Sequence, residues 1–162
     1  MTALSQTRPQ RPPLYTADQR ARRDATRWTL VQGILAPVQF VAFAVSLVLV
    51  LHFMLTGDGY DAATISILIK TVLLFTIMVT GAIWEKVVFG QYLLAPAFFW
   101  EDVFSFAVIA LHCLYLFGFW TASISPENLM IVALLAYGTY VINAAQFILK
   151  LRAARLDMAV RA

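Results

Sequence analysis

Four long apolar segments constrain this chain more than any other feature of its sequence. They cover residues 28–55, 62–84, 103–122 and 129–149. A helix of about 20 mostly apolar residues is long enough to cross the hydrocarbon core of a bilayer. Only 13% of the residues are charged, whereas an ordinary soluble domain has about 25%. We therefore predict an all-α integral membrane bundle of four transmembrane helices.

The positions of the basic residues predict how the bundle is oriented. Residues 1–27 form an Arg-rich tail, residues 151–162 form a second basic tail, and Lys86 lies in the link between the second and third segments. The other two links contain acidic residues and no Lys or Arg. Because loops rich in Lys and Arg remain in the cytoplasm, we expect both tails to be cytoplasmic. The membrane domain is then residues 28–150.

The link between the second and third segments is unusually apolar. Residues 87–100 read VVFGQYLLAPAFFW, a run too short to span a bilayer and more typical of an interfacial or re-entrant segment. Gly90 and Pro96 interrupt it, and its aromatic side chains suit the level of the lipid headgroups. Two interpretations stay open at this point. The segment is either an interfacial anchor or a hydrophobic shelf for a flat amphiphilic ligand.

Polar side chains within the apolar segments mark a candidate site. Such residues are costly in a bilayer and usually face the interior of a bundle. Helical spacing places most of them on stripes in the cytoplasmic half: Gln32, Gln39, Glu85, Glu101, Asp102, Asn143 and Gln146. These stripes predict a polar pocket open to the cytoplasm, below an outer half that is nearly all apolar.

Each of these residues also has a simpler interpretation. The amides often only hydrogen-bond to a neighbouring helix, and the carboxylates could be ordinary interfacial charges. Two carboxylates on facing helix ends could instead share a proton. His112 could accept an interhelical hydrogen bond, act as an acid or base, or bind the metal of a tetrapyrrole. Lys70 could reach outward toward the interface or pair inside the bundle, and we expect its role to be structural.

The motifs of the common cofactor enzymes are missing from the chain. There is no CxxCH, GxGxxG, P-loop or HExxH sequence, and Cys113 is the only cysteine. We therefore expect no bound cofactor and no protein-held metal. The net charge of +3 is explained by the two tails, so it does not indicate a nucleic-acid partner.

Three stretches of the sequence carry a resemblance to a known family. They are DATRWTLVQGILAPVQF from Asp24, TIMVTGAIWEKVVFGQYLLAPAFFWEDVFS from Thr76 and TYVINAAQFILKLRAARL from Thr139. Together they resemble the 3-vinyl bacteriochlorophyllide hydratases of bacteriochlorophyll biosynthesis, over about residues 14–157. The resemblance implies a lyase that adds water to the vinyl group of a magnesium chlorin or bacteriochlorin and needs no cofactor. It also implies a bacterial inner, intracytoplasmic, membrane.

For this reaction we expect acid–base catalysis by the carboxyl groups. Glu101 is the first candidate for the acid, followed by Asp102 and Glu85, and His112 could be the base or a ligand to the substrate magnesium. The candidate binding residues are Gln32, Gln39, Trp84, Phe99, Trp100, Asn143 and Gln146. The sequence is compatible with a homo-oligomer or with association with other enzymes of the pigment pathway. Two alternatives are a pigment-binding assembly subunit without activity and a small transporter-like or chaperone-like bundle, for which the sequence offers little.

Overall fold

The structure is a computed structural model that describes residues 13–161, with side chains up to Leu156. All of its regular elements are helices. They are α1 (Ala17–Ala25), α2 (Arg27–Thr56), α3 (Tyr60–Phe89), α4 (Phe99–Thr121) and α5 (Pro126–Arg161). The helices α2 to α5 are each long and apolar enough to cross a membrane, so the predicted four-helix membrane bundle is confirmed. The part of the N-terminal tail before Pro13 lies outside the described residues.

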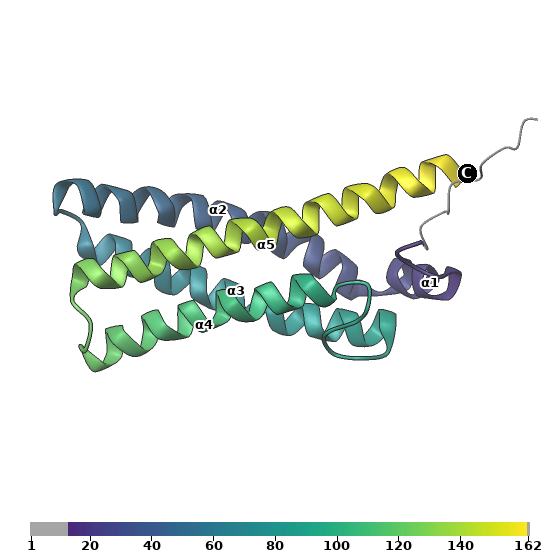
Figure 1. Ribbon diagram of the computed structural model, residues 1–162, viewed down its shortest axis with the longest axis horizontal. Coiled ribbons are helices and arrows are strands. Elements are labelled where there is room, and N and C mark those ends of the chain that lie inside the picture. Colours follow the sequence, from purple (N-terminus) through teal and green to yellow (C-terminus); the bar gives the residue numbers. More distant parts are fainter. Residues whose placement is uncertain (1–12, 162) are drawn as a thin grey trace, which may run out of the picture.

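The four long helices lie side by side as two hairpins (Figure 1). α2 packs along α3, α4 packs along α5, and contacts of α2 with α5 and of α3 with α4 join the hairpins. α1 and the end of α5 lie at the same end of the bundle (Figure 1), as an even number of crossings requires. We call this the loop end, because the α3–α4 connection, residues 90–98, also lies there.

Local sequence explains where the helices begin and end. Thr16 and Gln19 form a capping box at the start of α1, which satisfies two backbone N–H groups. Thr26 ends α1 and caps α2. Gly57 and Gly90 end α2 and α3 with φ angles of +80° and +89°, a left-handed conformation that glycine adopts without a Cβ clash.

The surface of the bundle is apolar and its interior is partly polar. Large side chains such as Leu55, Val48 and Trp120 are 84%, 66% and 74% exposed, which is an unusually apolar surface for water and a suitable one for lipid. The interior holds the main apolar core and a number of buried polar groups. We conclude that the chain is a multi-pass membrane protein.

Candidate functional site

Two buried carboxyl groups hold the loop between α3 and α4. Glu85 and Asp102 are 5% and 3% exposed. Oε2 of Glu85 accepts the Ala95 N–H at 3.2 Å, and Oδ2 of Asp102 accepts the Leu94 N–H at 2.7 Å. Because Leu94 and Ala95 are adjacent in the chain, the two carboxyl groups lie close to each other. The carboxyl pair therefore lies directly beneath the loop and fixes its backbone.

The third carboxyl group of the cluster belongs to an ion pair. Glu101 is 5% exposed and accepts a short hydrogen bond from the ammonium group of Lys150 on α5. Lys150 also donates to the Ala97 carbonyl oxygen and lies 5.3 Å from the ring centre of Phe98. Lys150 was not among the predicted site residues. Its spacing from Asn143 and Gln146 on one stripe was the signal that it belongs to the site.

The predicted aromatic residues separate into two groups. Trp84 packs at the loop end against Phe89 and Phe98, and its indole N–H donates to Thr29 at 2.9 Å. Phe99 and Trp100 are 42% and 65% exposed and lie on the outer surface at the start of α4. Trp84 is therefore part of the packed interior, whereas the other two rings face the surroundings of the bundle.

Two of the predicted amides make interhelical hydrogen bonds. Gln32 on α2 donates to Thr80 on α3 at 2.8 Å, and Asn143 on α5 donates to Ser105 on α4 at 2.8 Å. Ser105 in turn donates to the Glu101 carbonyl oxygen. Both amide atoms of Gln39, Oδ1 of Asn143 and Oε1 of Gln146 are buried without a hydrogen bond to any described residue.

His112 lies deeper in the bundle and is fully engaged. Its Nε2 contacts the Lys70 ammonium at 3.0 Å, and its Nδ1 contacts the Val108 carbonyl oxygen at 2.8 Å. Lys70 is completely buried and also lies against the rings of Tyr137 and Tyr140. The lone pair that could bind a substrate metal thus faces an ammonium group. Lys70 pairs inside the bundle, which was one of its two predicted arrangements.

The expectation of a nearly apolar outer half is wrong. Beyond Lys70, the Ser46 hydroxyl hydrogen-bonds to Ser66 at 2.7 Å and to Tyr137 at 2.5 Å, and Thr64 and Tyr115 are buried nearby. The sequence did not reveal this network because serine, threonine and tyrosine side chains do not interrupt an apolar segment.

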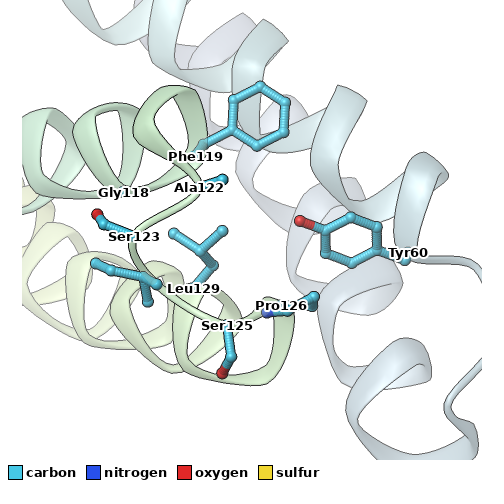
Figure 2. A pocket seen from close by; sticks show the side chains of 9 residues that line it. Tyr60, Gly118, Phe119, Ala122, Ser123, Ser125, Pro126 and Leu129 are labelled. Atoms are coloured by element: carbon cyan, nitrogen blue, oxygen red, sulfur yellow. The ribbon is translucent and has the colours of Figure 1, made fainter.

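A cavity of about 470 Å³ opens at the other end of the bundle, where α2 joins α3 and α4 joins α5. Figure 2 shows the ring of Tyr60 on one side of it and Phe119 and Leu129 on the other. None of the predicted site residues lines this cavity. The carboxyl groups, Lys150 and the loop therefore form the candidate site, at the loop end.

Comparisons with known proteins agree on one family. The family model described as 2-vinyl bacteriochlorophyllide hydratase (BCHF) matches residues 15–153. A protein of that name from Rhodobacter capsulatus is 71% identical over 93% of this chain and 88% of its own length. One from Cereibacter sphaeroides is 73% identical over 90% of each chain. No solved structure matches. The names with 2-vinyl and 3-vinyl differ only in numbering, and the chain belongs to the 2-vinyl bacteriochlorophyllide hydratase family.

Proposed function

We propose that this protein adds water to the vinyl group of a magnesium chlorophyllide or bacteriochlorophyllide and forms the 1-hydroxyethyl derivative. Family membership over nearly the whole chain supports the reaction class. The observation that carries the site is the carboxyl pair of Glu85 and Asp102, buried beneath an apolar loop beside the ion pair of Glu101 and Lys150. Acid-catalysed hydration requires a proton donor held close to an apolar substrate, and this arrangement supplies one.

The carboxyl pair is the preferred acid on geometric grounds. Two carboxyl groups buried close together disfavour ionisation of both, so one keeps a proton that can be transferred to the terminal carbon of the vinyl group. The positive charge that develops on the inner carbon is delocalised into the macrocycle. The oxygen of a water molecule then bonds to this carbon, and the water returns a proton to the carboxylate. The sum of these steps is addition of one water, with the acid regenerated.

Glu101 takes a different role from the one first expected. It remains part of the catalytic cluster, but its carboxylate is already engaged by Lys150. We assign it to holding Lys150 and, through the Ala97 carbonyl, the loop. His112 is likewise assigned to holding Lys70 rather than to acid–base chemistry or to magnesium binding.

The substrate is a flat macrocycle with apolar faces and one carboxylate. It suits the lipid interface at the loop end, where Tyr92, Phe99 and Trp100 are exposed. From there the vinyl group reaches the carboxyl pair when the loop moves aside. Of the predicted binding residues inside the bundle, Gln39, Asn143 and Gln146 keep buried polar atoms without a partner among the described residues. Gln32 and Trp84 are instead bonded to Thr80 and Thr29.

We infer that the loop end lies at the cytoplasmic face of the bacterial inner, intracytoplasmic, membrane. Among the residues whose side chains are described, this end holds eight of the twelve Lys and Arg residues of the chain: Arg20, Arg22, Arg23, Arg27, Lys86, Lys150, Arg152 and Arg155. Association with a second copy, or with enzymes that supply or consume the pigment, is a further expectation.

The test distinguishes two roles of Glu85 and Asp102, which are donating a proton to the substrate and holding the loop. Glu85→Gln and Asp102→Asn keep an oxygen that accepts the loop N–H, but neither side chain has an acidic proton. Each variant in membranes should bind 3-vinyl bacteriochlorophyllide with little change and convert it about 10²–10⁴ times more slowly. Glu127→Gln, far away at the start of α5, is the matched control.

Conversion is followed by absorbance and by a mass increase of one water. Full activity in both carboxyl variants would remove the pair from the mechanism. Tight pigment binding without any mass change in the unmodified protein would favour the alternative of a pigment-binding subunit.

A further inference from the structure

Three amide side chains place unused polar atoms inside the bundle. Gln39 is 2% exposed, and neither its Nε2 nor its Oε1 forms a hydrogen bond with a described residue. Two further buried atoms also lack a hydrogen bond with a described residue: Oδ1 of Asn143, whose side chain is 8% exposed, and Oε1 of Gln146. A buried polar group without a partner usually costs about 1–3 kcal/mol. Several together indicate that a small polar molecule binds there.

The amides lie at one level of the bundle. α2 and α5 run antiparallel, and the ring of Phe43 on α2 contacts Tyr140 on α5, with ring centres 5.1 Å apart. Gln39 lies one turn from Phe43 toward the loop end, and Asn143 lies one turn from Tyr140 in the same direction. The two amides therefore face the same layer of the interface between α2 and α5, and Gln146 follows one turn closer to the loop.

This layer is directly connected to the carboxyl cluster. Nδ2 of Asn143 donates to Ser105 at 2.8 Å. Ser105 lies one helical turn beyond Glu101 and Asp102 on α4, a rise of about 5 Å. A molecule bound by the amides is therefore about one turn deeper than the carboxyl pair.

We propose that Gln39, Asn143 and Gln146 bind the water molecule that the reaction consumes. The proposal rests on the proposed hydratase function and names the site of its second substrate. A buried water typically makes about three hydrogen bonds, and these amides offer one donor and three acceptors. When the terminal vinyl carbon has taken a proton, the oxygen of this water bonds to the inner carbon. One of its protons returns to the carboxylate of the pair.

Gln39→Leu tests the proposal because a structural and a water-binding role predict opposite changes in stability. If the amide serves only the bound water, leucine should raise the melting temperature by about 2–4 °C and lower the hydration rate by about 10²-fold. Gln32→Leu is the matched control, since Gln32 is bonded to Thr80 and its loss should lower the melting temperature. Gln39→Met serves as a second variant if leucine does not fit.

Deuterium exchange in D₂O distinguishes this role from that of the acid. A cation formed without a positioned water loses a proton from its new methyl group and returns to the vinyl form. In Gln39→Leu, deuterium should therefore enter the terminal vinyl carbon faster, relative to hydration, than in the unmodified protein. In Glu85→Gln exchange and hydration should slow together, by about 10²–10⁴-fold.

The outcomes are distinct. Higher stability, slower hydration and a raised ratio of exchange to hydration support the water site. Normal hydration in Gln39→Leu and Gln39→Met, or a lowered melting temperature in both, overturns it while the hydratase function stands. No hydration by the unmodified protein overturns the proposed function itself.

Discussion

Replacing Lys150 with methionine removes the partner of a buried carboxylate while keeping the length of the side chain. Glu101 has a side-chain exposure of 7%, so water cannot replace the lost ammonium group, whereas Lys150 is 27% exposed. Removing one partner of a buried ion pair typically lowers the free energy of unfolding by about 3–5 kcal/mol. Because this pair lies at the edge of the membrane, we expect the lower end of that range, about 3 kcal/mol.

A second substitution shows whether the unpaired charge causes that loss. In the double variant Glu101→Gln with Lys150→Met no buried carboxylate is left, and only the hydrogen bond from Lys150 to the Ala97 oxygen is missing. That bond contributes about 1 kcal/mol. The double variant should therefore be about 2 kcal/mol more stable than Lys150→Met alone, although it contains one more change.

The free energy of unfolding is measured by reversible unfolding in mixed micelles, with helix content as the signal. Leu149→Ala, a lipid-facing change on the adjacent position, controls for general effects on α5. A double variant that is no more stable than Lys150→Met would refute the reasoning, because the loss would then arise from packing and not from the charge.

Two further predictions concern the interior of the bundle. His112→Leu leaves the buried Lys70 ammonium without its acceptor and should destabilise the protein by about 3 kcal/mol, whereas His112→Leu combined with Lys70→Met should be close to the unmodified protein in the same unfolding assay. Equal losses of stability in the single and the double variant would show that the contact between Lys70 and His112 contributes little. Gly118→Ala brings a Cβ into a clash with the side chain of Ile124 and should lower the free energy of unfolding by about 1–3 kcal/mol through overpacking. Gly138→Ala is the control, because the space around its Cβ is open, and it should not lower the melting temperature. Similar effects at both glycines would contradict the predicted clash at Gly118.

The apolar segments predicted the fold well because length and hydropathy determine a membrane span directly. The helices extend beyond the predicted spans, however. α3 continues to Phe89, and α5 runs from Pro126 to Arg161. Hydropathy finds the part of a helix that lies in lipid and is not sensitive to the polar turns that continue it into water.

The sequence predicted which residues gather at the candidate site but not the contacts they make there. Helical spacing placed Glu85, Glu101 and Asp102 at one end, where the structure has them. It could not show which carboxyl group pairs with Lys150 and which hold the loop, because those contacts depend on the backbone of residues 90–98. Leu94 has a φ of +60°, a conformation uncommon for a residue with a side chain, and no sequence pattern in this segment predicts it.

The loop gives Glu85 and Asp102 a second role besides the proposed catalysis. Irregular backbone near a membrane needs hydrogen-bond partners from the protein, and Glu85 and Asp102 supply them to Ala95 and Leu94. A protein that only needed to fold this loop could use the same two residues. Glutamine and asparagine offer an equivalent carbonyl oxygen to the loop but no acidic proton. A loss of turnover in Glu85→Gln or Asp102→Asn with intact pigment binding would therefore identify the acid, and unchanged turnover would leave these residues as anchors of the loop.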